Sequence, residues 1–142
     1  MNADTLKAKE ILNEGDFTLV FCQGHNIITS ADRGVSPLMK LLEDGKDYSD
    51  YSAADKVVGG AAAYLYVLLG IKEVYALTLS ERARLVFEKY GILYFSCRLV
   101  PYIVNRKGDG PCPMEEATKN ATDPEDALRR IREKLIKMKN GN

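Results

Sequence analysis

Residues 74–100 have the sequence VYALTLSERARLVFEKYGILYFSCRLV, and this stretch decides the class of fold. The apolar run Val74 to Leu79 is typical of a buried strand, while Ser80 and Gly91 are suited to begin and end the helix that follows it. A second β-prone run extends from Ile92 to Val100. A strand, a helix and a strand at this spacing predict a right-handed crossover between two parallel strands.

The residues before this unit predict a hairpin and two short helices. Phe17 to Cys22 is strongly β-prone, and a turn at Gln23 to His25 joins it to a second short run, Asn26 to Thr29. Two such runs across a tight turn predict a β-hairpin. One helix is predicted from Thr5 to Glu14 and another from Ser36 to about Glu43, where proline in the first turn is favourable.

Residues 52–69 are apolar on nearly all sides of a helical wheel, which predicts a buried helix that ends at Gly70. In this interpretation Asp55 and Lys56 lie in the first turn of the helix. The positive end of the helix dipole stabilises the carboxylate of Asp55 and disfavours the charge of Lys56. A lysine so placed is a candidate acid, base or anion ligand, and the alternative is that Lys56 extends to solvent or pairs with Asp55.

The order of these elements predicts the fold class. With a last helix that begins at Asp123 and Pro124, the chain is expected to form one α/β domain over residues 1–142. Its sheet is expected to be mixed and mostly parallel, begun by an antiparallel hairpin, with helices on both faces.

Composition excludes several classes of protein. The chain has 20 basic and 20 acidic residues, so no net charge attracts a nucleic acid, and we expect none as a partner. The uncharged stretch from Val57 to Ile71 is too short to span a membrane. The three cysteines, Cys22, Cys97 and Cys112, include no CxxC pair, which favours a reducing, cytoplasmic location. Cys22 and Cys97 lie in apolar runs and are expected to be buried.

The irregular segment NRKGDGPCPME, residues 105–115, carries the strongest candidates for chemistry. Asn105 and Arg106 are candidate ligand-binding residues, since such segments often hold binding groups on a rigid scaffold. Cys112 is flanked by prolines and is a candidate nucleophile, which would need a nearby cation or helix start. Glu115 is a candidate helix cap or acid–base group. The alternative is an ordered surface loop with an inert thiol. Arg33 is a weaker candidate for an anion contact.

Two motifs carry a family resemblance. The sequence ADKVVG at residues 54–59 with AAA at 61–63, together with NR at 105–106 and CPME at 112–115, resembles the bacterial family called domain of unknown function 1893. The likeness runs from about Thr5 to Leu135. It implies a cytidine-deaminase-like fold, which is a three-layer α/β/α sandwich around a five-stranded mixed sheet.

In the zinc deaminases of that fold, the metal lies between the starts of two helices. By this resemblance, the two helix starts here correspond to Ala54–Lys56 and to Thr78–Glu81. Neither offers the thiolate or imidazole that zinc needs, so we expect no metal and no other cofactor.

The resemblance and the residues together predict a pocket at these helix starts for a small polar or anionic molecule, nucleotide-like ligands being one such class. Its expected lining is Asp55, Lys56, Ser80 and the loop at 112–115, with Arg33, Asn105 and Arg106 as further binding residues. A cysteine-dependent enzyme is the alternative, with Cys112 as nucleophile and Lys56 or Glu115 as proton donor. A structural domain without a ligand is the third interpretation. No membrane contact is expected, and a homodimer is left open.

Overall fold

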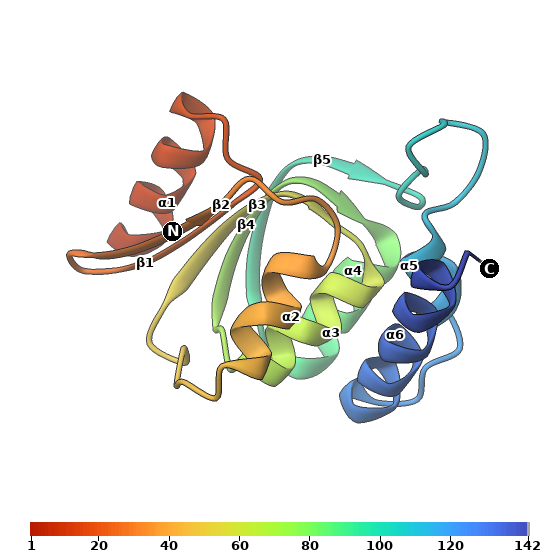
Figure 1. Ribbon diagram of the computed structural model, residues 1–142. Helices are drawn as coiled ribbons and strands as arrows, with labels where there is room; N and C mark the ends of the chain where they lie inside the picture. The colour runs from red at the N-terminus through yellow and green to blue at the C-terminus, as the bar shows by residue number, and fades with distance from the viewer. Residues whose placement is uncertain (142) are drawn as a thin grey trace.

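The computed structural model describes residues 1–141 and contains one five-stranded sheet flanked by helices (Figure 1). The elements, in chain order, are α1 (Ala3–Glu14), β1 (Leu19–Gln23), β2 (Asn26–Ser30), α2 (Ser36–Glu43), β3 (Ser52–Val58), α3 (Gly60–Leu69), β4 (Glu73–Ser80), α4 (Glu81–Tyr90), β5 (Leu93–Val100), α5 (Pro113–Thr118) and α6 (Pro124–Lys139).

The sheet is mixed, with the strand order β2-β1-β3-β4-β5. β1 pairs antiparallel with both β2 and β3, whereas β3, β4 and β5 are parallel. Gly24 has a φ of 57° in the turn between β1 and β2, a conformation that glycine adopts without strain. The predicted hairpin, the predicted crossover from β4 to β5 and the mostly parallel sheet are all confirmed.

The prediction of one helix across residues 52–69 is wrong. Ser52–Val58 forms the strand β3, and the helix α3 begins only at Gly60. β3 lies between β1 and β4 with helices over both faces, so both sides of the strand are apolar and it has no alternating pattern. Asp55 and Lys56 therefore lie in the middle of a strand, where they do not experience the dipole field expected in the first turn of a helix.

Two apolar layers hold the helices on the sheet. On one face, Ala8 and Leu12 of α1 pack against Val20, Ala54 and Tyr75. All the other helices belong to the larger core on the opposite face, as Figure 1 shows, with α3 at its centre. No helix among residues 1–141 is long and apolar enough to cross a membrane.

The edge strand β5 corrects the expectation for one cysteine. Cys22 on β1 is buried as predicted, but Cys97 on β5 is exposed. β5 has a neighbour on one side only, and α1 packs on β1, β3 and β4 rather than on β5. The same position leaves Leu93 and Leu99 exposed.

Candidate ligand-binding cleft

A cleft of about 940 Å³ lies between the end of β3, the segment before α2, the loop after β5 and the last turns of α6. Its volume is in the range typical of sites for small molecules. The sequence-predicted site residues that line it are Arg33, Asp55, Lys56, Asn105, Arg106, Cys112 and Glu115. Ser80 is fully buried and does not line the cleft. In Figure 1 the loop after β5 extends beyond the sheet, near α5 and the C-terminal end of α6.

Asp55 and Lys56 reach this cleft from β3. Both residues are half-buried. One carboxylate oxygen of Asp55 accepts a hydrogen bond from the Tyr66 hydroxyl at 2.7 Å, and the other accepts one from the Val57 amide at 3.2 Å. Burial raises the pKa of Asp55 to about 7, against the lowering effect of these hydrogen bonds. At neutral pH the carboxyl group is therefore close to its midpoint between the charged and neutral forms.

Glu115 occupies the position where the starts of α3 and α4 meet. The residue is only 3% exposed. One of its carboxylate oxygens accepts from the Gly60 amide and lies 3.4 Å from the Ser80 hydroxyl, and the other accepts from the Ile103 amide at 3.1 Å. The carboxylate thus caps α3 and fastens the loop after β5 to the scaffold. These contacts favour a positioning role for Glu115 over the proton-donor role considered from the sequence.

The glycines at the start of α3 make room for this carboxylate. A methyl group on Gly59 would lie 2.9 Å from a Glu115 carboxylate oxygen, and one on Gly60 would lie 2.8 Å from Cδ of Arg82. Arg82 in turn donates a hydrogen bond to the backbone carbonyl of Glu115 at 2.6 Å. The predicted pocket between the two helix starts is therefore filled by the protein's own side chains, and the open cleft lies beside it.

The loop that carries Asn105 and Arg106 is ordered by its own hydrogen bonds. The amide side chain of Asn105 donates to Asp109 at 2.8 Å and accepts from the Asp109 backbone at 3.2 Å. The Cys112 amide donates to the Ile103 carbonyl at 2.7 Å. Asn105 therefore shapes the loop through its side chain, while Arg106 is exposed at the rim of the cleft.

The charged residues of the cleft differ in how they are paired. Each of its acidic side chains has a partner: Asp32 pairs with Lys40 at 3.0 Å, and Asp55, Asp109 and Glu115 accept the hydrogen bonds described above. In the part of the chain that the structure describes, none of its four cationic side chains forms a salt bridge. These cations are Arg33, Lys56, Arg106 and Lys107. The arrangement leaves the hydrogen-bond donors of these four cations open to a ligand, while the carboxylates are already occupied by donors of the protein.

Cys112 lies in the same lining and is half-buried. It lies at the end of the loop, immediately before the short helix α5. Over residues 1–141, no group of three or more His, Cys, Asp or Glu side chains is placed to hold a metal ion.

Sequence reasoning missed the apolar wall of the cleft and two supporting residues. Ile103, Val104 and Met138 line the cleft, and nothing in the sequence separates them from ordinary core or surface positions. Tyr66 and Arg82 act on the site through Asp55 and Glu115. The one sequence feature that could have located the start of α3 is the glycine pair before the AAA run. A glycine pair is unfavourable within a helix and indicates that the helix begins there.

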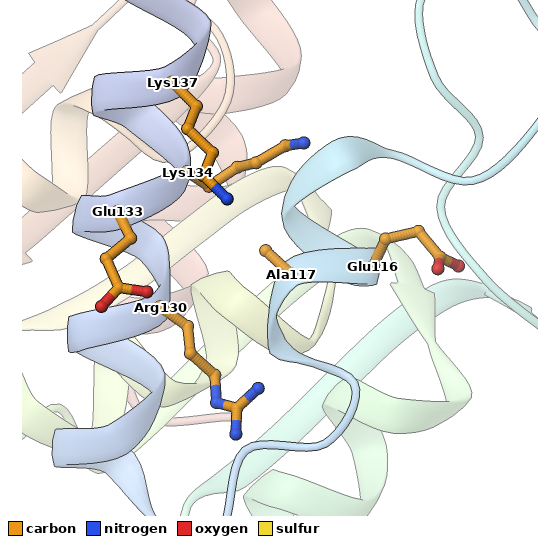
Figure 2. A pocket seen from close by; sticks show the side chains of 6 residues that line it. All are labelled: Glu116, Ala117, Arg130, Glu133, Lys134 and Lys137. Carbon is orange, nitrogen blue, oxygen red and sulfur yellow. The ribbon is translucent and has the colours of Figure 1, made fainter. Parts of the chain in front are cut away.

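A second, smaller hollow of about 300 Å³ lies between α5 and α6 (Figure 2). It is lined by Glu116, Ala117, Arg130, Glu133, Lys134 and Lys137. Both of its acidic residues form salt bridges along their own helices, Glu116 with Lys119 and Glu133 with Arg129. Its wall is formed by surface side chains of mixed charge, so the larger cleft is the better candidate site.

Comparison with known proteins identifies relatives along most of the chain. The sequence model of a family described as a domain of unknown function (DUF1893) matches residues 7–135. A search of curated proteins found no match. Among solved structures, the chain is similar to a DUF1893 family protein from Thermotoga maritima, with 25% sequence identity and a TM-score of 0.87. That similarity covers 94% of this chain and 92% of the other.

Proposed function

Because the chain belongs to the DUF1893 family, whose description assigns no activity, we propose its function from the cleft: it is a metal-free, deaminase-like domain that binds a small anionic molecule. The observation that carries this proposal is the imbalance of pairing around the cleft. Arg33, Lys56, Arg106 and Lys107 have no salt-bridge partner within residues 1–141, whereas every carboxylate beside them has a partner. An anionic ligand would pair with these cations through charge-assisted hydrogen bonds.

The deaminase likeness in this proposal concerns the scaffold and not the zinc. In the zinc deaminases the metal lies at two helix starts, which here begin at Gly60 and Glu81. These starts offer a serine hydroxyl and the Glu115 carboxylate, and no group of three or more His, Cys, Asp or Glu side chains in the described chain is placed to hold a metal ion. The residues do not fit a zinc ion, so no step is assigned to one. A cytoplasmic location belongs to the same proposal and is supported by three free cysteines.

Matched pairs of ligands test the proposal. Adenosine monophosphate is compared with adenosine, and hexyl phosphate with hexanol, by isothermal titration calorimetry at low and high salt. We expect the phosphorylated member of at least one pair to bind at least tenfold more tightly, with an advantage that shrinks as salt rises. Equal binding within both pairs, or no binding by any of the four, would overturn the proposal.

Charge variants identify the site. We expect Arg33→Gln and Lys56→Gln each to weaken binding of the phosphorylated ligand by about three- to tenfold, since each removes one charged partner. Arg132→Gln is the matched control, because Arg132 is exposed on α6, forms no salt bridge within residues 1–141 and does not line the cleft. Equal losses in all three variants would place the ligand elsewhere.

A cysteine-dependent enzyme is the second candidate function. The observation that supports it is that Cys112 lines the cleft together with Lys56. If Cys112 is a nucleophile, an electrophilic ligand leaves a covalent adduct on Cys112 that mass spectrometry of the intact protein detects, and Cys112→Ser abolishes it. If the domain only binds, Cys112→Ser keeps the full affinity and no adduct forms on Cys112 faster than on the exposed Cys97.

A further inference from the structure

The wall of the cleft is aliphatic. Its large apolar side chains include Leu19, Leu38, Ile103, Met114, Leu135 and Met138, and no Phe, Tyr or Trp lines it within residues 1–141. Aromatic rings, on which the bases of single-stranded nucleic acids commonly stack, are thus not offered by this wall. A flexible aliphatic body, in contrast, packs well against leucine, isoleucine and methionine side chains.

Several of these aliphatic side chains are unusually exposed. Val57 is 47% exposed, Val104 is 55% exposed and Met138 is 48% exposed. They come from β3, from the loop after β5 and from α6, three segments that are far apart in the sequence and meet at the cleft. Exposed apolar side chains that gather in a hollow mark a binding surface, because covering them removes apolar area from water.

The cations in the same lining are the second feature that selects the ligand. Arg33, Lys56 and Arg106 line the cleft together with this aliphatic wall, and none of them forms a salt bridge in residues 1–141. We infer that the ligand of the cleft is an amphiphilic anion, with an aliphatic chain on the exposed apolar wall and a phosphate or carboxylate at the cations. This inference rests on the proposed function and specifies the class of its ligand.

A series of chain lengths tests the aliphatic part. Hexyl, octyl and decyl phosphate are titrated by calorimetry below the concentrations at which they form micelles. We expect affinity to rise by up to about fourfold for each methylene that is buried, together with a negative heat-capacity change. Decanoate and decanol are the companion probes. The better of decyl phosphate and decanoate identifies the head group, and decanol is expected to bind at least tenfold more weakly than that ligand.

Two substitutions on α6 test the position of the chain. Met138→Asn removes an apolar contact of the cleft, whereas Ile136→Asn changes a residue that is 60% exposed on the same helix and does not line it. We expect Met138→Asn to weaken decyl phosphate binding by about fivefold, with a smaller effect on hexyl phosphate, and Ile136→Asn to leave both unchanged. Equal effects of the two variants would contradict the assigned wall.

The cysteines provide an independent measurement in the unmodified protein. Saturating decyl phosphate is expected to slow the alkylation of Cys112 by a neutral reagent at least fivefold. Cys97 on β5 lies outside the cleft and is the internal control, with an unchanged rate. If both rates change equally, the ligand acts on the whole molecule rather than in the cleft.

The outcomes separate this inference from the function on which it rests. If affinity rises with chain length and Cys112 is protected, the ligand class is confirmed. If adenosine monophosphate binds tightly while affinity for alkyl phosphates is weak or independent of length, the aliphatic class is wrong and the anion-binding function stands. If neither the phosphorylated probes nor decanoate bind better than their neutral partners, both are wrong.

Discussion

The start of α3 and the open cleft beside it are two polar regions that share one wall, yet they treat an anion in opposite ways. At the start of α3 the chain supplies its own anion, since the buried Glu115 carboxylate accepts from Gly60, Ile103 and Ser80. In the cleft, cations such as Arg33 and Lys56 have no salt-bridge partner within the described residues. A helix N-terminus is thus not by itself evidence of a ligand site, because the fold can satisfy it internally.

Substitution of Glu115 removes the internal anion at the start of α3 and is expected to have the largest effect on stability. Glu115→Ala leaves the amides of Gly60 and Ile103 without their acceptor in a buried setting, which costs roughly 3–5 kcal/mol of unfolding free energy. Urea denaturation measures this loss. The control is Glu116→Ala, one residue away and exposed, which should change stability by less than about 0.5 kcal/mol. A Glu115→Ala loss as small as the control's would show that the cap is not structural.

On the cleft side of the comparison, the protonation of Asp55 makes the stability of the protein depend on pH. Burial raises the pKa of Asp55 to about 7 in the folded state, and in the unfolded chain it returns to about 4. Between these values the folded state binds more protons, so its stability falls as the pH rises from about 4 to about 7 and then levels off. The cost above pH 7 is roughly 3 kcal/mol, reduced by the partial exposure of the residue.

The variant Asp55→Asn removes this titration and keeps an acceptor for the Tyr66 hydroxyl, while it gives up the 3.2 Å hydrogen bond from the Val57 amide. We expect it to be more stable than the natural protein at pH 8 by roughly that amount, with the two nearly equal at about pH 4. Thermal or urea unfolding across this pH range checks it. Parallel stability curves for the two proteins would contradict the assignment.

The close approach at Gly60 gives the next smaller effect. Gly60→Ala places a methyl group 2.8 Å from Cδ of Arg82 and 3.2 Å from a Glu115 oxygen, and is expected to cost about 1–3 kcal/mol. Gly110→Ala is the matched control in the loop, because its nearest contact, Asn105 Nδ2, would be an ordinary 3.7 Å away. Comparable losses from both substitutions would mean that backbone freedom, rather than the close approach, decides the cost.

The smallest expected effect concerns the electric field of the cleft. Cations near Cys112 should favour the anionic reagent iodoacetate over neutral iodoacetamide. We expect Lys56→Met to lower the ratio of the two alkylation rates at Cys112 by about two- to threefold, and to leave the ratio at Cys97 unchanged. The ratio should fall in the natural protein as salt is added. Lys89→Met, an exposed residue on α4 outside the cleft, is the control and should behave like the natural protein.

Much of the fold could be predicted from the sequence because local signals agree with tertiary structure there. Ser80 and Asp123 cap their helices as expected, accepting from the amides of Ala83 and Asp126. The hairpin and the crossover between β4 and β5 follow from short turns and apolar runs. β3 was not predicted because a strand that is buried on both faces has no period of two in its apolar residues. These residues also continue into a helix that is itself buried.

The sequence identified most of the residues of the candidate site, but it did not predict how they are arranged. The loop at 105–115 stood out by composition, and Asp55, Lys56 and Arg33 line the same cleft as that loop. What the sequence could not show is that Glu115 fills the helix starts, because that contact joins positions 55 residues apart. The exposure of Cys97 was also hidden, since an edge strand and a central strand have the same composition when one face is apolar.

The strand order described above also sets the time course of folding. The hairpin of β1 and β2 has partners that are close in the chain and can form within microseconds. The pairing of β1 with β3 spans a longer stretch of chain that includes α2. The parallel pairs of β3 with β4 and of β4 with β5 each have a helix between their strands. Chains dominated by such distant pairings fold in milliseconds to seconds, and we expect the pairing of β3 with its two neighbours to form after the hairpin.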